Sequence, residues 1–186
     1  MIQLLKTTDE QYFEDLINIS DLQLGAGFMK MEDLQKMLHH HHVKIHIKII
    51  DNQVVGYKIN LGMTKKELRE WLPNYQDEIL SLFPGDRMIN WHKTTAVHPD
   101  FVSKRVGTEL FSYALKNPPA KSLYWLSVAW APGGIAHVGK LMAKHNFVCA
   151  FEAKEYWKED SLKLGYQCEE CGDPPCTCSA LIYYKL

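Results

Sequence analysis

The sequence predicts an α+β domain: a mixed, mainly antiparallel, twisted sheet flanked by helices. Three observations lead to this prediction. The length of 186 residues suits one domain, for which about 150 residues is typical. Residues 43–49 (VKIHIKI) alternate apolar and polar side chains, as a half-buried antiparallel strand does. From residue 88 onward, strand-like and helix-like segments follow one another, which gives the overall order βααββαβαβαββ.

The N-terminal half contains two helical segments and a hairpin. Thr8 or Asp9 can cap the first helix, and Gly25 begins the run that ends it. The turn at Asp51-Asn52 lets the strand 43–49 return as an antiparallel partner. The predicted elements of this half are a strand at 2–5, helices at 13–24 and 31–38, strands at 43–49 and 54–62, and a helical segment at 64–83 that Pro73 divides.

The C-terminal half alternates between strands and helices. The predicted strands are 88–97, 123–131, 147–153 and 180–185, and the predicted helices are 103–115 and 135–145. No repeat, low-complexity tract or linker interrupts the pattern. We therefore expect residues 1–186 to form a single domain.

The charge balance argues against nucleic acid and membrane partners. The chain has 21 Lys+Arg, 22 Asp+Glu and a net charge of −1. Binding to nucleic acid or to an anionic membrane surface requires clustered Lys and Arg. Residues 122–139 carry no formal charge and approach the length of a bilayer span, but Pro132-Gly133-Gly134 divides them. The N-terminus has no basic stretch before an apolar run, so we expect no signal peptide and a soluble cytoplasmic protein.

Four of the five cysteines lie together near the C-terminus, and Cys149 stands apart as an expected buried apolar residue. Closely spaced thiols in a chain without a secretion signal favour a metal over disulfides. Four thiolates complete a tetrahedron around zinc, which predicts a structural Zn²⁺ without an open coordination position. The alternatives are reduced thiols on a surface loop, and disulfides or redox thiols. The predicted ligands, inside a Cys-rich loop at 165–179, are Cys168, Cys171, Cys176 and Cys178.

The strand–loop–helix segment 88–115 predicts an anion site. A strand ending at Val97 leads into the N-terminus of a helix, where free N–H groups and the helix dipole favour phosphate. Lys104 and Arg105 add positive charge, and Gly107 lets backbone approach a ligand closely. The alternative interpretation is an ordinary amphipathic helix that packs on the sheet.

This segment, VHPDFVSKRVGTEL, resembles the acyl-CoA-binding motif of the GNAT superfamily of acyl-CoA-dependent N-acyltransferases, V-x-P-x-(Y/F)-(R/Q)-x-x-G-x-(G/A)-T-x-L. Val102 stands where the family has Arg or Gln, and Arg105 where it has Gly. The order of strands and helices over nearly all of the chain also resembles that family. The matching residues are Val97, Pro99, Phe101, Gly107, Thr108 and Leu110.

The resemblance implies a GNAT-like fold and an N-acyltransferase with acetyl-CoA or a related acyl-CoA as co-substrate. It also implies direct attack of an amine on the thioester in a ternary complex. The backbone of Ala96 and Val97 would hold the pantetheine and the thioester. The residues implied for the diphosphate are Ser103, Lys104, Arg105, Val106, Gly107 and Thr108.

Proton transfer in this family uses an acid or base on the strand before Val97, where this chain offers His92, Lys93 and Thr94. His92 is the predicted base, because imidazole titrates near neutral pH, and we expect it to share a strand face with Thr94 and Ala96. Its alternative role is that of a surface or hydrogen-bonded strand histidine. Lys93 would be charged, and a poor base unless buried.

The family's proton-donating Tyr corresponds to Met142, whose thioether cannot donate a proton. This leaves an alternative function: a catalytically degenerate CoA-binding or protein-interaction module with a structural zinc knuckle. The acceptor of an active enzyme would be a small-molecule or protein amine. Trp71, Leu72 and Tyr75 are expected in the core, with a substrate-cleft wall or a homodimer contact as alternatives.

Overall fold

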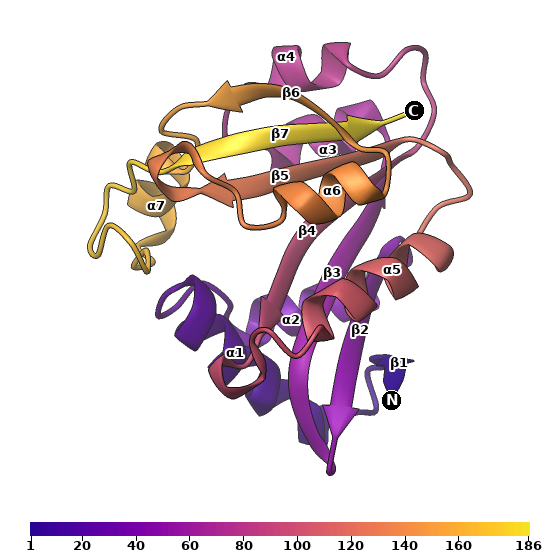
Figure 1. The fold of residues 1–186 in the computed structure, drawn as a ribbon, viewed down its shortest axis with the longest axis vertical. Helices are drawn as coiled ribbons and strands as arrows, with labels where there is room; N and C mark the ends of the chain where they lie inside the picture. Colours follow the sequence, from indigo (N-terminus) through magenta and orange to yellow (C-terminus); the bar gives the residue numbers. More distant parts are fainter.

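The computed structural model describes residues 1–186, which form one seven-stranded sheet with the strand order β1-β2-β3-β4-β5-β7-β6 (Figure 1). All neighbouring strands are antiparallel except β4 and β5, which are parallel. The predicted mixed, mainly antiparallel sheet is therefore confirmed. The strands are β1 (Ile2–Leu4), β2 (Val43–Ile50), β3 (Gln53–Met63), β4 (Ile89–Val97), β5 (Trp125–Ala131), β6 (Val148–Ala153) and β7 (Ser179–Lys185).

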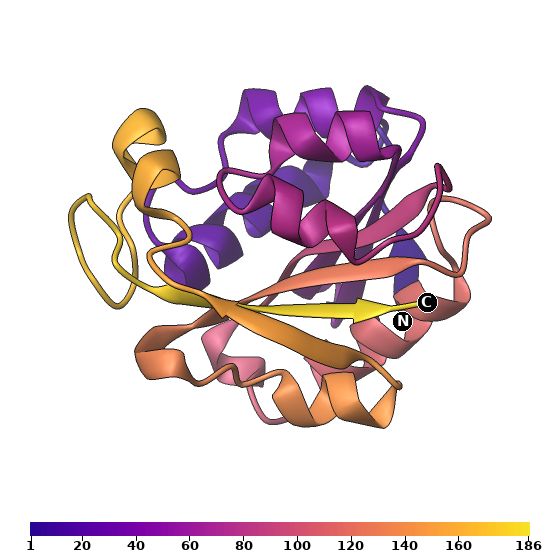
Figure 2. The ribbon, with the colours of Figure 1, turned by 90° about the horizontal axis from the view of Figure 1, so that it is seen from above.

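Helices cover both faces of the sheet (Figure 2). One face carries α1 (Phe13–Leu24), α2 (Met31–His39), α3 (Lys65–Trp71) and α4 (Gln76–Ser81), and the other carries α5 (Val106–Lys116) and α6 (Gly139–Lys144). A seventh helix, α7 (Lys158–Leu164), lies between β6 and β7 in the chain. Short 3-10 helices occur at Glu10–Tyr12, Pro99–Phe101 and Pro132–Gly134. None of the helices combines the length and the apolar character that crossing a membrane requires.

Two apolar clusters lie on opposite faces of the sheet. The main core contains 29 buried residues, among them Tyr57 and Ile59 of β3, and lies under α1–α4. The second cluster lies under α5 and α6 and consists of Phe111, Trp125, Ala129, Met142, Phe147 and Tyr183. A smaller cluster, Val55, Val106 and Leu110, packs β3 against the first turns of α5.

Several predicted boundaries differ from the observed ones for a local backbone reason. The helix expected from Ser103 begins at Val106, because Ser103 and Arg105 adopt left-handed φ values of +66° and +64°. A right-handed helix cannot contain such residues. The helix expected from Ile135 begins at Gly139, after a 3-10 turn. Helix α7 was not predicted.

Strand β4 contains a β-bulge at Lys93. His92 and Thr94 both have cross-strand partners on β3, whereas Lys93 has none. The extra residue shifts the alternation of side chains, so His92 lies on the α5 face and Ala96 on the main-core face. The expectation that these two residues share a face is therefore wrong. The β3 partners are Asn60 for His92, Ile59 for Thr94 and Tyr57 for Ala96.

Gly56 of β3 fixes the position of the first turn of α5. A Cβ atom on Gly56 would lie 2.9 Å from Cγ1 of Val106 and 3.0 Å from the carbonyl oxygen of Ala96. Such distances leave no room for a side chain, so a larger residue would push α5 away from the sheet. The close approach therefore holds the N-terminus of α5 beside the end of β4.

Candidate functional site

The parallel strands β4 and β5 pair over only three residues. Their pairing runs from Asn90↔Trp125 to His92↔Ser127 and stops there, although β4 continues to Val97 and β5 to Ala131. Figure 1 shows the two strands diverging beyond this point. The sheet therefore lacks β4–β5 hydrogen-bond pairing between the C-terminal halves of these strands, and we call this unpaired region the opening.

The backbone of β4 offers hydrogen-bond donors to this opening. The N–H of His98 donates to the carbonyl of Val55 on β3. Because N–H groups alternate between the two sides of a strand, that of Ala96 also points to β3, whereas those of Thr95 and Val97 point to the opening. Val97, one of the two residues expected to hold the thioester, thus presents a donor on the correct side.

The N-terminus of α5 lies next to the opening. The N–H of Glu109 donates to the carbonyl of Arg105, which leaves the N–H groups of Val106, Gly107 and Thr108 without helical acceptors. No side chain caps this end. The side chains of Ser103, Lys104 and Arg105 in the preceding turn are exposed. The six residues predicted to bind the diphosphate therefore form one continuous segment, in which Val106 is buried and Gly107 is partly exposed. The other four are exposed.

Arg105, which replaces the glycine of the family motif, adopts a left-handed backbone conformation. It takes φ +64° and ψ 7° at the position where the family has glycine. Such a conformation costs a non-glycine residue roughly 1 kcal/mol. Gly107 is not required by packing, since a Cβ there would meet only Cγ2 of Val97, at 3.6 Å.

The ring of His92 is buried between two aromatic rings on the α5 face. Its centroid lies 4.5 Å from those of Phe111 and Trp125. Nδ1 lies 2.8 Å from Oδ1 of Asn60 and donates to it, while Nε2 has no partner. Burial, with smaller contributions from Lys58 and His145, lowers the pKa of His92 well below its ordinary value. The ring is therefore neutral but enclosed, and its role as a base stays a prediction.

Lys93 lies on the opposite face, and its ammonium group is surrounded by indole rings. Nζ is 4.9 Å from the ring centroid of Trp91 and 5.3 Å from that of Trp71 at the end of α3. Burial lowers the pKa of Lys93, and Asp160 of α7 partly opposes this shift. A lowered pKa moves a lysine toward its neutral form, which is the form that can accept a proton. Sequence reasoning set Lys93 aside because a lysine is charged and a poor base unless buried, and the sequence does not show that Lys93 lies between two indole rings.

A row of polar residues crosses the sheet at the last paired position of β4 and β5, where the opening begins. Its residues are cross-strand partners in the order His92, Ser127, Tyr183 and Cys149. The hydroxyl of Tyr183 would lie 3.2 Å from a Cβ on Gly139, the first residue of α6. Burial, followed by the neighbouring Cys149, raises the pKa of Tyr183, so the phenol keeps its proton at neutral pH.

Tyr183 packs in the same cluster as Met142, the residue at the family's Tyr position. The structure therefore provides a phenol on the side of the sheet where Met142 cannot act as a donor. Sequence reasoning missed Tyr183, because only the strand register brings it there. Cys149, expected to be buried, is exposed.

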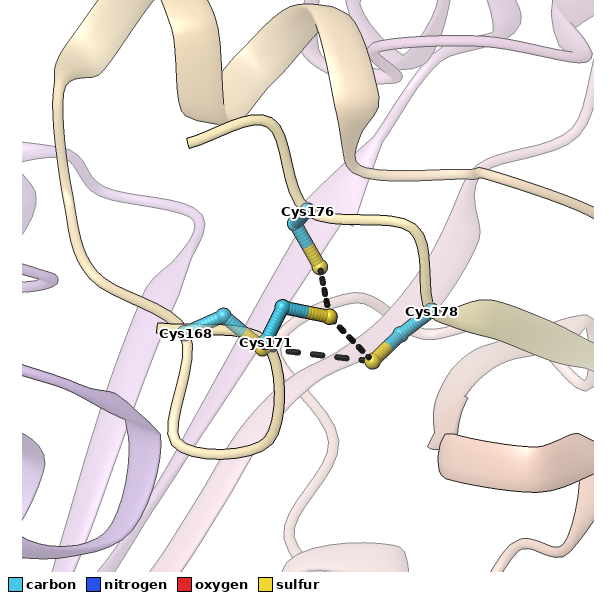
Figure 3. A group of neighbouring side chains, drawn as sticks. All are labelled: Cys168, Cys171, Cys176 and Cys178. Carbon is cyan, nitrogen blue, oxygen red and sulfur yellow. Dashed lines mark hydrogen bonds between the residues drawn. The ribbon is translucent and has the colours of Figure 1, made fainter. Parts of the chain in front are cut away.

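The four cysteines predicted as zinc ligands come together between α7 and β7 (Figure 3). Cys168, Cys176 and Cys178 are buried and Cys171 is partly exposed. Burial opposes ionisation of Cys171, but hydrogen bonds from Thr177, Cys178 and Cys168 together lower the pKa of this thiol to about 7. Burial raises the pKa of Cys176 and of Cys178. A thiolate is the form that binds a metal.

A surface cavity of about 480 Å³ lies at the other end of α5. It is lined by Lys116, His145 and Lys185, together with apolar residues that include Trp125. The N-terminal turn of α5 and the C-terminal part of β4 do not contribute to it. We therefore place the candidate site at the opening between the strands and not in this cavity.

No protein-family model matches the sequence, and no curated protein matches it. Solved structures do resemble the fold. The ribosomal-protein-S18-alanine N-acetyltransferase from Escherichia coli is 13% identical, with 100% of this chain and 92% of that chain covered and a TM-score of 0.65. NAA60 from Arabidopsis thaliana, in complex with a bisubstrate analogue, is 10% identical, with 99% and 95% covered and a TM-score of 0.65.

The loading GNATL domain of CurA from Lyngbya majuscula is 12% identical, with 100% of this chain and 96% of that chain covered and a TM-score of 0.66. At these identities the likeness concerns the fold. The chain therefore has the fold of GNAT acetyltransferases, and the fold that the motif and the element order predict is confirmed.

Proposed function

We propose that this chain is an N-acyltransferase that moves an acetyl or similar acyl group from acyl-CoA to an amine by direct attack. The observation that carries this proposal is the loss of β4–β5 pairing after His92↔Ser127, beside the uncapped N-terminus of α5. The opening suits a pantetheine arm, and the helix N-terminus suits a diphosphate. The GNAT fold supports acyl transfer as the type of reaction.

Acyl-CoA would bind with its diphosphate against residues 103–108 and its pantetheine along β4. The side chains of Lys104 and Arg105 add two positive charges at the diphosphate. In the opening, the N–H of Val97 would donate to the thioester carbonyl and stabilise the oxyanion that forms when the amine attacks. Ala96 would contribute through the position of its backbone beside Val97.

The acceptor amine would approach from the face that carries α1–α4, because the diphosphate site lies on the α5 face. Lys93 is the titratable residue of the bulge on that face. Its neutral amine would take a proton from the acceptor nitrogen as the new C–N bond forms and the C–S bond breaks. His92, the base predicted from the sequence, lies on the α5 face and is the competing candidate.

The departing thiolate of CoA needs a proton, and Tyr183 is our candidate donor. Its raised pKa keeps the phenol protonated, and its position beside Gly139 places it on the α6 side of the opening. The acceptor would be a small-molecule or protein amine. In keeping with the charge balance, we propose a cytoplasmic enzyme without nucleic acid or membrane partners.

A second function is favoured by one observation: Met142 is buried at the position of the family's Tyr. A protein that binds acyl-CoA without transferring the acyl group would need no proton donor. The chain would then be a CoA-binding or protein-interaction module.

Calorimetry with acetyl-CoA, followed by thiol release across a panel of amines, tests both functions. The proposed enzyme binds acetyl-CoA and releases CoA in the presence of at least one amine. Tyr183→Phe serves as the matched variant, because it removes only the hydroxyl and should retain acetyl-CoA binding. Failure to bind acetyl-CoA would contradict the enzyme and the CoA-binding module and leave only a protein-interaction module. Binding without turnover on any amine would support the CoA-binding module.

A further inference from the structure

The four sulfurs of the cysteine cluster are spaced like the corners of a tetrahedron. All four lie within 4.8 Å of one another. The separations are 3.9 Å for Cys168–Cys178, 4.0 Å for Cys171–Cys176 and 3.4 Å for Cys171–Cys178 (Figure 3). Zn–S bonds of about 2.3 Å put tetrahedral sulfurs about 3.8 Å apart. A disulfide would require about 2.05 Å. The spacing therefore suits four ligands of one ion.

The first pair of cysteines is held by its own turn. The N–H of Cys168 donates to the carbonyl of Gly172 at 2.8 Å, and the N–H of Gly172 donates back to the carbonyl of Cys168 at 2.8 Å. Gly172 adopts φ +76°, a conformation that favours glycine. This closed turn presents Cys168 and Cys171 on one side.

The second pair is held from outside the loop. The N–H of Cys176 donates to Oγ of Ser161, a fully buried residue of α7, at 2.9 Å. The carbonyl of Cys178 accepts from the N–H of Tyr156 at 3.2 Å. Both pairs are thus positioned by hydrogen bonds that do not involve sulfur. Four protein ligands fill a tetrahedron, which is typical of a structural zinc site.

The same loop contacts a distant part of the chain, the loop between α1 and α2. Gln167, the residue before the first cysteine, donates its N–H to the carbonyl of Ala26 at 3.4 Å. A Cβ on Gly25 would lie 1.7 Å from the carbonyl oxygen of Gln167. The rings of Phe28 and Tyr166 pack edge to face with centroids 5.5 Å apart. The cysteine loop therefore rests directly on residues 25–28.

We propose that Cys168, Cys171, Cys176 and Cys178 bind one structural Zn²⁺, and that this ion holds the α1–α2 loop in place. The inference rests on the proposed function in one respect only: residues 25–28 belong to the α1–α4 face, from which the acceptor amine would approach. Zinc binding itself is independent of any activity.

Metal analysis of the full chain tests whether the four cysteines bind zinc. After expression with added zinc and removal of free metal, about one zinc per chain is expected. Cys171→Ser should lose most of this zinc, whereas Cys149→Ser, the matched control outside the cluster, should keep it. Cobalt substitution should give the visible absorption of a tetrahedral thiolate complex. A chain that retains no zinc, or retains iron instead, would overturn the assignment.

Hydrogen exchange tests whether the ion holds the α1–α2 loop in place, and this measurement needs no variant. Chelation of zinc from the wild-type chain should speed amide exchange at residues 165–178 and also at residues 24–30. Exchange in α5, on the other face of the sheet, should stay unchanged. Unchanged exchange at residues 24–30 after zinc loss would overturn the link between the ion and the loop. Zinc content and amide exchange are both measured without acetyl-CoA. Failure of the proposed function would therefore not affect either measurement.

Discussion

Gly25 and Gln167 lie so close together that a single methyl group on Gly25 would meet the carbonyl oxygen of Gln167 at 1.7 Å. The contact joins the α1–α2 loop to the cysteine loop across more than half of the chain. Backbone forms both sides of this contact, so no side-chain movement can relieve it. Gly25 also adopts φ +107°, which side-chain-bearing residues rarely adopt.

Gly25→Ala should therefore destabilise the protein by more than about 2 kcal/mol, as backbone strain and a steric clash act together. Gly27→Ala is the matched control: Gly27 has φ +76° but nothing within 4 Å of its Cβ position. Gly27→Ala should lower the free energy of unfolding by only about 1 kcal/mol, because only the left-handed backbone opposes the side chain there. Urea denaturation of both variants gives the comparison, and equal losses would contradict the close contact.

Lys58 should make stability depend on pH in the alkaline range. This buried lysine donates to Oγ1 of Thr95 at 2.8 Å and has no carboxylate partner. Burial lowers its pKa from 10.5 to about 7. Between these values the unfolded chain binds a proton that the folded chain lacks. Stability should therefore rise with pH from about 7 to 10, by up to about 1.4 kcal/mol per pH unit.

Lys58→Met removes the titrating group and should flatten this slope, with its largest gain in stability near pH 7. Lys66→Met, a change at an exposed lysine, should leave the slope as in the wild type. Thermal unfolding followed at several pH values between 7 and 9.5 measures the difference. A wild-type slope that persists in Lys58→Met would show that Lys58 does not cause it.

The N-terminus of α5 allows binding and stability to be separated. In Gly107→Glu, the new carboxylate should interact favourably with the positive end of the helix dipole, so the stability of the protein should be unchanged or higher. It should also repel the diphosphate and raise the Kd for acetyl-CoA at least tenfold. Gly107→Ala, for which the structure has room, should change the Kd much less. Calorimetry and thermal unfolding measure the two effects, and equal Kd values would place the diphosphate elsewhere.

The sequence was sufficient to predict the sheet, because the alternation of residues 43–49 and the alternating segments after residue 88 are local patterns. It was also sufficient to predict a strand that leads into a helix N-terminus, since this pattern is local as well. Binding of an anion there stays a prediction. Arg105, a departure from the family motif, adopts a left-handed backbone that the sequence did not predict. The four cysteines, close in sequence, come together as predicted.

What the sequence could not predict depends on register and on contacts between distant segments. The bulge at Lys93 lies in a run of four polar residues, 92–95, and this run does not reveal which residue is extra. It places His92 and Ala96 on opposite faces, where the sequence predicted one shared face. Tyr183 reaches the α6 side only through pairing of β7 with β5. The contact between Gly25 and Gln167 likewise requires the folded chain.

The final prediction decides between the two candidate bases. Lys93→Met keeps a long side chain between Trp71 and Trp91 but removes the amine. It should lower kcat by a factor of about 10² to 10⁴, the usual contribution of a general base. It should also abolish the fall in kcat/KM on the acid side that protonation of Lys93 causes, while the Kd for acetyl-CoA stays within a factor of about two.

His92→Gln is the matched comparison, because its amide can retain the hydrogen bond to Asn60. If Lys93 is the base, this variant should keep most of kcat and the wild-type pH profile.

The main effect of His92→Gln should be on stability. His92 is buried in its neutral form in the folded chain, whereas in the unfolded chain it takes up a proton as the pH falls below its ordinary pKa of 6.5. The wild-type protein should therefore lose stability toward acid more steeply than His92→Gln. The reverse pattern of kcat loss, large for His92→Gln and small for Lys93→Met, would assign the base to His92 and require the acceptor amine to reach the α5 face.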